Sequence, residues 1–297
     1  MTAISEQLPE MIVDEGRWHK LFIRKFEIGI VEAFKVLRSK NIEPILIKGW
    51  AAARNYPRDK FRFFEDVDLA FPASQYDLAR EIITSNPTFL IAIDLHREFR
   101  HLDTVPWDTA FARSELINVD GGEIRILRPE DHFRVLCVHW LNDGGAYRDR
   151  LWDVYYAVEN RPPDFDWEMC LDSVSATRRR WIETTIAIAA KYLLLNVEEL
   201  PFKVGPHAIP DWITRCLEKE WETDVRLIPL EACVHQPRIL IPQILKRLPP
   251  NPIEATIEME GDFDDGWRLP YQIGSMRKRI GPSVKRVTPA VRSLLRK

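Results

Sequence analysis

The sequence predicts an α+β protein, in which a small mixed β-sheet core with packed helices is followed by a mainly helical region. Three observations lead to this class. Short apolar runs typical of strands alternate with helical patterns up to residue 127. Beyond residue 128 the apolar residues recur at three- and four-residue steps, which is the helical period. An apolar fraction of 45% is normal for a globular protein with a sizeable core, and no internal repeat is present.

Length and charge set outer limits on organisation and function. The 297 residues fit one large domain or two ordinary ones. A formal net charge of −3 excludes a uniformly basic nucleic-acid binder but leaves room for a local basic patch. The predicted parts are an N-terminal tail (1–16), a first domain (17–127), a helical domain (128–245) and an irregular, basic C-terminal tail (246–297).

The cysteines and the apolar segments indicate the compartment. The four cysteines form no CxxC pair and no metal-binding spacing, so reduced, buried thiols are expected. They are Cys137, Cys170, Cys216 and Cys233. Residues 1–16 lack the apolar core of a signal peptide. The most apolar helical stretch, 181–195, carries Glu183 and Lys191 and is too short to span a bilayer. These observations predict a cytoplasmic protein.

The first predicted elements are a helix and a strand. Apolar residues recur with helical spacing over 18–39, after a tail that ends near Gly16. Residues 44–47 form an apolar run, which is typical of a strand that is buried on both faces. A turn at Lys48-Gly49 and a short helix over 50–56 are expected next.

Strands and helices then alternate. A helix is expected after the second strand, with Ser74 as its N-cap. The tripeptide Asp120-Gly121-Gly122 separates the last two strands and is a good hairpin signal. The predicted strands after the first are 67–71, 89–96, 116–119 and 123–127.

Helical patterns dominate the rest of the chain until prolines interrupt them. The predicted helices are 132–141, 147–158, 167–174 and 178–195. Prolines break further helices within 196–245, and the chain is expected to be irregular after Pro249-Pro250. The end of the chain, 275–297, has eight lysines and arginines and no acid. Pro282 and Pro289 are expected to prevent one continuous helix there.

Two aspartates on the second predicted strand form the centre of a candidate site. Asp66 and Asp68 are two residues apart, and such residues share one face of a strand. Like charges this close repel each other unless a cation or a basic partner neutralises them. The Lys48-Gly49 turn precedes them, and a third acid, Asp94, lies at the end of the next strand. The pattern therefore indicates a site for Mg²⁺ and phosphates.

This order of motifs resembles the nucleotidyltransferase superfamily, which includes DNA polymerase β and the antibiotic nucleotidyltransferases. More narrowly, it is similar to a poorly characterised bacterial branch called nucleotidyltransferase family proteins. The resemblance covers roughly residues 42–159. One departure is that the usual Gly-Ser or Gly-Gly after the first strand is Lys48-Gly49-Trp50 here. The motifs are, in order, Lys48-Gly49, Arg62, Asp66-Val67-Asp68 and Asp94-Leu95-His96.

The resemblance implies a catalytic nucleotidyltransferase domain over 17–127. Such an enzyme would transfer NMP from an NTP to a hydroxyl of a small molecule, sugar, peptide or RNA, with Mg²⁺ or Mn²⁺ as cofactor. Asp94 could also take a proton from the acceptor hydroxyl. The implied metal-binding and catalytic residues are Asp66, Asp68 and Asp94. The implied nucleotide-binding residues are Lys48, Gly49 and Arg62, which would neutralise or closely approach the triphosphate.

Other interpretations of the same residues stay open. Asp66 and Asp68 can form a solvated strand end. Lys48 or Arg62 can instead form salt bridges with these acids. His96 can orient an acid, ligate a metal or be satisfied in the core. For the whole chain, the alternatives are a catalytically inactive binding module with the same fold and a phosphoryl transferase, such as a kinase, that uses the same metal site.

The basic end of the chain has three interpretations. Chain ends are commonly solvated and mobile. The segment can also dock on the acidic surface of its own chain near 258–265. A third interpretation is contact with nucleic acid or with a membrane surface, and phosphate contacts would make such binding weaken steeply with salt.

Overall fold

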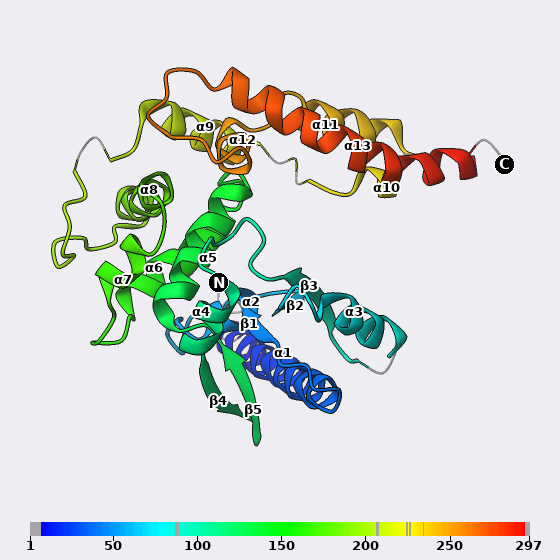
Figure 1. Ribbon diagram of the computed structural model, residues 1–297, viewed down its shortest axis with the longest axis vertical. Coiled ribbons are helices and arrows are strands. Elements are labelled where there is room, and N and C mark those ends of the chain that lie inside the picture. The colour runs from blue at the N-terminus through cyan, green and yellow to red at the C-terminus, as the bar shows by residue number, and fades with distance from the viewer. Residues whose placement is uncertain are drawn as a thin grey trace. The chain divides into compact units, whose positions relative to one another are not determined.

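The computed structural model describes residues 7–86, 89–205, 208–223, 225, 227–233 and 235–294, which belong to two compact units (Figure 1). The sheet unit comprises Met1–Leu136 and Tyr156–Cys170, and the helical unit comprises Cys137–Tyr155 and Leu171–Lys297. The two predicted domains, 17–127 and 128–245, stay a prediction. Residues 1–6 of the predicted tail and 295–297 of the basic end lie outside the described residues.

Within the described residues of the sheet unit, five strands form one mixed sheet. Its strands are β1 (Ile45–Ile47), β2 (Asp66–Phe71), β3 (Ala92–Arg97), β4 (Glu115–Val119) and β5 (Gly122–Ile126). Their order in space is β3-β2-β1-β5-β4. β1 pairs antiparallel with β2 and parallel with β5, β2 pairs parallel with β3, and β4 pairs antiparallel with β5. The predicted α+β class is confirmed, and β3 begins at Ala92 rather than at residue 89.

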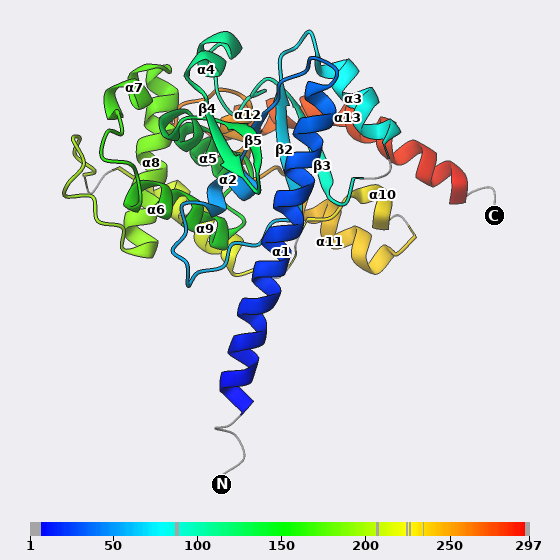
Figure 2. The ribbon, with the colours of Figure 1, turned by 90° about the horizontal axis from the view of Figure 1, so that it is seen from below.

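Helix α1 (Gln7–Arg38) packs against the sheet. Phe26, Ile30 and Phe34 are buried in one apolar cluster with residues of β1 and β2. The expectation that the chain is a tail up to Gly16 is wrong, because the helix begins at Gln7 and runs through this glycine. One glycine in a helix interior costs only about 1 kcal/mol, which a long helix tolerates. Figure 2 shows the N-terminal turns of α1 projecting beyond the sheet.

Short helices and one tight turn connect the strands. The helices are α2 (Gly49–Ala53), α3 (Tyr76–Ser85) and α4 (Trp107–Arg113). Ser74 is not the N-cap of α3, since Gln75 occupies that position and no side chain caps the helix. The predicted hairpin between β4 and β5 is confirmed. Asp120 and Gly121 have φ angles of 50° and 75°, as a two-residue hairpin turn with positive φ at both positions requires.

The predicted helices between residues 129 and 195 are present with slightly different ends. They are α5 (Pro129–Asn142), the 3-10 turn η1 (Arg148–Arg150), α6 (Leu151–Glu159), α7 (Trp167–Asp172) and α8 (Ala176–Leu193). Ser175 caps α8 by accepting a hydrogen bond from the backbone N–H of Arg178. Trp181, in α8, is fully buried and donates to the carbonyl of Gly261 over 3.0 Å, so the helix is tied to the C-terminal part of the helical unit.

The C-terminal part of the chain is more helical than predicted. Its helices are α9 (Asp211–Trp221), α10 (Leu230–Cys233), α11 (Pro237–Arg247), α12 (Pro252–Glu258) and α13 (Leu269–Leu294). The expectation of irregular structure after Pro249-Pro250 is therefore wrong, and so is the expectation that Pro282 and Pro289 divide the end of the chain. A proline removes its own backbone hydrogen bond, and the bonds on either side can carry the helix past it.

The basic segment of α13 contacts its own chain. Arg279 forms ion pairs of 2.8 Å with both Glu254 and Glu258 of α12, and Ser275 and Lys278 also bond to Glu258. The predicted docking near 258–265 is thus made by the first turns of the segment. Contact with nucleic acid or a membrane stays a prediction. No helix among the described residues combines the length and the apolar composition that a bilayer span requires.

Candidate functional site

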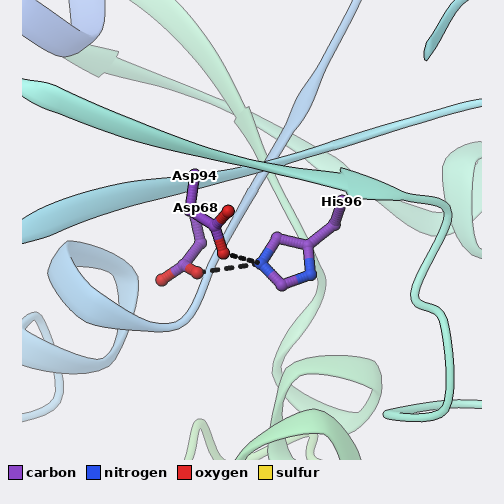
Figure 3. A group of neighbouring side chains, drawn as sticks. All are labelled: Asp68, Asp94 and His96. Carbon is purple, nitrogen blue, oxygen red and sulfur yellow. Dashed lines mark hydrogen bonds and ion pairs between the residues drawn. The ribbon is translucent and has the colours of Figure 1, made fainter. Parts of the chain in front are cut away.

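The pairing of two strands brings the candidate residues together. In the parallel β2–β3 ladder, Asp68 is the register partner of Asp94, and Ala70 is the partner of His96. Residues two apart on a strand project from one face, so Asp68, Asp94 and His96 lie on the same face of the sheet. Figure 3 shows the three side chains converging there. A ligand atom from each lies within 4.8 Å of the others, and the group could hold a metal ion.

His96 bridges the two carboxylates. Its Nε2 atom lies 2.9 Å from Oδ1 of Asp68 and 3.1 Å from Oδ2 of Asp94 (Figure 3). The imidazole and the Asp68 side chain are buried, whereas half of the Asp94 side chain is exposed. The other ring nitrogen, Nδ1 of His96, is buried without a hydrogen-bond partner among the described residues. His96 therefore faces the acids with one nitrogen and has no second bond that would fix its tautomer.

Lys48 supplies the positive charge at this group. Its Nζ atom lies 2.6 Å from Oδ1 of Asp68, and both side chains are close to fully buried. The backbone of Lys48 has φ 54° and ψ −150°, an uncommon conformation for a residue with a side chain. The predicted Lys48-Gly49 turn is therefore sharp. Directly after the end of β1, the turn directs the Lys48 side chain toward the Asp68 carboxylate.

A histidine far along the chain holds this turn. The backbone N–H of Lys48 donates to Nε2 of His132, in α5, over 3.2 Å. Burial lowers the pKa of His132 to about 4, with a further contribution from the nearby Arg54 charge. The imidazole is therefore neutral near pH 7, which it must be to accept this bond. Sequence reasoning missed His132, because its partner is a backbone group that leaves no mark in the side-chain pattern.

The two carboxylates of the group are ionised at neutral pH. Burial alone would raise the pKa of Asp68, but bonds and charges from His96 and Lys48 outweigh it and hold the pKa below its usual value. The hydrogen bond from His96 is the largest cause that lowers the pKa of Asp94 to about 2, and the charges of Lys48 and Arg100 add to it. Both acids can therefore accept a cation without first losing a proton.

Gly49 is buried beside the carboxylates. A Cβ atom on this residue would lie 3.4 Å from the carbonyl oxygen of Asp66 and 3.8 Å from Oδ2 of Asp68. Its φ angle of 32° also disfavours any residue with a side chain. The structure thus explains why a glycine stands at this turn. Its predicted close approach to phosphate oxygens stays a prediction.

The other two predicted residues lie outside the converging group. Asp66 is exposed at the first position of β2 and, by strand alternation, shares the face of Asp68. Arg62 lies in the preceding loop, partly exposed, and donates to the carbonyl of Phe63. The structure thus brings Lys48, Asp68 and Asp94 together with His96, and the predicted roles of Asp66 and Arg62 stay predictions.

The donor set fits a divalent cation. Two ionised carboxylates and one imidazole nitrogen point at a common position, and Asp94 keeps that position open to solvent. Carboxylate oxygens are ligands that Mg²⁺ and Mn²⁺ prefer, whereas an imidazole is more typical of zinc, copper, iron and nickel. One lysine and one shared imidazole nitrogen face the two carboxylates.

Comparisons with known proteins do not assign the chain to a family. No family model matches the chain, and no curated protein matches it. Among solved structures, it is similar to a crystal structure of an antigenic nucleotidyltransferase-like protein from Paracoccidioides brasiliensis. The identity is 14% and the TM-score 0.42, over 57% of this chain and 88% of the other. At this identity and TM-score the likeness is too weak to assign a function.

Proposed function

We propose that the chain is a metal-dependent nucleotidyltransferase, which transfers NMP from an NTP to an acceptor hydroxyl. The observation that carries the proposal is the convergence of Asp68 and Asp94 on one face of the sheet, beside Lys48 and the Gly49 turn. Mg²⁺ or Mn²⁺, when bound, supplies charge stabilisation for the attacking and leaving oxygens. In the transfer, the hydroxyl oxygen bonds to the α-phosphorus, the bond to the bridging oxygen breaks and pyrophosphate leaves.

Each carboxylate has a role that its surroundings support. Asp68 is buried and fixed by two partners, which suits a ligand that must not move. Asp94 is half exposed, so it can contact both a cation and a substrate. A general base works best with a pKa near the operating pH, so the pKa of about 2 favours a ligand role for Asp94 over proton transfer. Asp66, on the same face, would ligate the cation that arrives with the triphosphate.

The positive groups bind and orient the nucleotide. Lys48 Nζ balances Asp68 in the free protein, and it becomes available to a phosphate oxygen once another cation balances that carboxylate. Gly49, which has no side chain, would let phosphate oxygens approach the backbone of the turn closely. Arg62, in the loop before β2, would pair with phosphate oxygens in the same way. His132 holds the Lys48 backbone and so positions the turn.

The test is a labelling experiment on the full chain. Purified protein is incubated with α- or γ-labelled NTPs, Mg²⁺ or Mn²⁺, and candidate acceptors of each class. Transfer of the α label supports the proposal. Transfer of the γ label alone would indicate kinase chemistry, and no transfer with any acceptor would indicate an inactive binding module. Asp68→Asn serves as the negative control, because an amide cannot balance divalent charge as a carboxylate does.

A further inference from the structure

A surface of the sheet unit combines exposed aromatic rings with positive charge. We define the aromatic–basic patch as Arg17, Trp18, Lys20 and Leu21 of α1 together with Arg58, Lys60, Phe61 and Phe63 of the loop before β2. Trp18 is 70% exposed, Phe63 61% and Phe61 40%. Exposed rings of this size are unusual on a solvated surface, and a cluster of them marks an interaction site.

The rings of the patch are held in place from beneath. Phe61 and Phe63 lie 4.3 and 5.6 Å from the ring of His19, measured between centroids, and Phe63 lies 5.6 Å from Phe22. These contacts fix the loop against α1, which can be followed in Figure 2. The buried Phe64, 4.6 Å from the buried Phe26, anchors the loop in the core. The exposed faces of Phe61 and Phe63 are therefore fixed platforms, which lose little conformational freedom when a ligand stacks on them.

The charge of the patch is complementary to phosphate. Four exposed side chains supply this charge, namely Arg17, Lys20, Arg58 and Lys60. None of them forms an ion pair with another described residue, so their charges are available to a ligand. Asp59 is the acid nearest to them in the loop sequence. The chain as a whole carries a net charge of −3, so this local positive excess is a feature of the patch and not of the protein.

We infer that the aromatic–basic patch binds single-stranded nucleic acid, and that a strand end is the acceptor of the proposed transfer. This inference rests on the proposed function for its second part only. Bases stack on aromatic rings whatever their sequence, and lysines and arginines between the rings neutralise the backbone phosphates. The aromatic rings would also suit an apolar partner protein. Such a partner would leave the lysines and arginines of the patch without anionic partners.

The patch adjoins the candidate site within the same unit. The loop that carries Phe61 and Phe63 runs directly into Asp66, the first residue of β2. In the proposed complex, the strand runs from the patch past the start of β2 and presents its terminal hydroxyl to the α-phosphorus of a nucleotide at the site. The hydroxyl proton then passes to solvent and pyrophosphate leaves.

The test is fluorescence anisotropy with the full chain and fluorescein-labelled oligo(U) and oligo(dT) of about 12 nucleotides, in EDTA. We expect both to bind, with an affinity that falls steeply as salt rises. Trp18→Ala/Phe63→Ala should weaken binding by about tenfold or more, because two stacking platforms are lost. Trp18→Ala/Lys60→Ala, which leaves the Phe63 packing untouched, should also weaken binding and reduce the salt dependence.

The matched control is Leu90→Ala/Arg80→Ala, which removes an exposed apolar side chain and an exposed cation elsewhere in the sheet unit. It should bind as the wild type does. Tighter binding of oligo(U) or of oligo(dT) would name the acceptor as RNA or DNA. The inference is overturned if neither strand binds, if control and patch variants lose affinity equally, or if the patch variants convert an oligomer to monomers, since a second copy would then be the occupant.

Asp68→Asn separates this inference from the proposed function. The variant should bind the strands as the wild type does and should not extend them with α-labelled NTP. Strand binding by the wild type without transfer of the α label to any acceptor would support the patch as a binding surface, and it would contradict both the proposed function and the strand end as acceptor. Transfer of the α label to a small acceptor, without strand binding, would support the proposed function and overturn the patch.

Discussion

The sheet unit contains two groups of buried charges that differ in how they are balanced. The site group consists of Lys48, Asp68, Asp94 and His96. The closed group consists of Asp103, Arg113, Asp131 and Arg134, from α4, α5 and the loop before α4. Both contain two carboxylates. They differ in the positive charge that faces those carboxylates and in access from solvent.

In the closed group every charge is matched. The Nε and Nη2 atoms of Arg134 lie 3.0 and 2.9 Å from Oδ2 of Asp103, and Nη2 also contacts Asp131. Arg113 pairs with Asp131 over 2.8 Å. Two guanidinium groups thus face two carboxylates, and Asp103, Asp131 and Arg134 are at most 2% exposed. No charge is left for a ligand, so this group is structural.

In the site group one lysine and one shared ring nitrogen face two carboxylates, and Asp94 is 50% exposed. Two carboxylates that face only one lysine, with access from solvent, are what a cation requires. The comparison teaches that a buried acid pair by itself does not indicate function. The count of fixed positive charges around it, and its exposure, separate a binding site from a structural network.

The largest effect is expected from breaking the closed group. Arg134→Met should destabilise the fold by about 3–5 kcal/mol, because it leaves Asp103 and Asp131 buried without their main partner. Urea denaturation measures the loss. Arg24→Met, which removes an exposed ion pair with Asp120, should change stability by less than about 1 kcal/mol. A loss below about 1 kcal/mol for Arg134→Met would show that the closed group is not a structural network.

Breaking the site group should affect metal binding first. Asp68→Asn should lower Mn²⁺ affinity by about 100-fold, equivalent to about 2.7 kcal/mol, because it removes a ligand and its negative charge together. It should also abolish NTP turnover. Electron paramagnetic resonance of free Mn²⁺ measures the affinity. Asp77→Asn, on the exposed side of α3, is the control and should bind Mn²⁺ normally. Equal affinities in wild type and Asp68→Asn would remove Asp68 from the site.

The histidine behind the site should make stability depend on pH. The folded-state pKa of His132, about 4, lies below its unfolded value near 6.5, so the unfolded chain takes up the proton first. Its contribution is fully present above pH 6.5 and is lost as the pH falls toward 4. Between pH 7 and pH 5 the loss is about 2 kcal/mol. Stability measured by urea denaturation should fall less over this range in His132→Gln, and parallel curves would contradict the assignment.

Lys48→Met changes the charge of the site group in the opposite direction, because it removes the positive charge that faces the carboxylates. Removing the competing cation should raise Mn²⁺ affinity by about tenfold, a fraction of the roughly 4 kcal/mol expected for charges about 4 Å apart near a protein surface. The KM for NTP should rise at the same time, because a phosphate partner is lost. Lys40→Met, an exposed lysine on the same unit, should leave both quantities unchanged. Weaker Mn²⁺ binding in Lys48→Met would show that the lysine supports the metal site.

The smallest effect on metal affinity is expected at Asp66. Asp66→Asn should change Mn²⁺ binding without nucleotide by less than about threefold, since exposed charges interact weakly. Turnover of NTP should still fall by at least about tenfold if Asp66 ligates the cation that arrives with the triphosphate. Measuring both quantities on one preparation distinguishes these roles. Unchanged turnover would remove Asp66 from the predicted catalytic residues.

Periodicity and motif order predicted most of the sheet unit. Three elements could be predicted from local sequence alone, because their patterns depend little on the rest of the fold. They are the apolar run at 44–47, the Asp66–Phe71 strand and the Asp120-Gly121 hairpin. Lys48, Asp68 and Asp94 could be predicted together because Lys48 directly follows one predicted strand and each acid stands between apolar residues of another. The sequence placed Asp94 at the end of its strand, whereas it lies in the middle of β3. The role of His96 could not be predicted, since a histidine near a strand end has several uses and only the geometry shows it between the two acids.

Long-range contacts and helix continuity were the parts that sequence could not predict. The bond from Lys48 to His132 joins residues 84 positions apart through a backbone N–H, which no side-chain pattern records. In the C-terminal part, the dense prolines predict breaks that the helices α11 and α13 do not show. Pairing of Arg279 with Glu254 and Glu258 is a tertiary contribution that stabilises α13 against this propensity.

The register of β2 and β3 has a thermodynamic consequence for the whole chain. Asp68 and Asp94 face each other only when these strands are paired across the α3 crossover, and a shift by one residue would send one acid to the opposite face. The unfolded chain therefore has no such site. An ion that binds only the native chain stabilises it by mass action, by about 2.7 kcal/mol at 100 times its dissociation constant. Cation occupancy and completion of the β2–β3 ladder are thereby linked, so the melting temperature should rise with metal concentration.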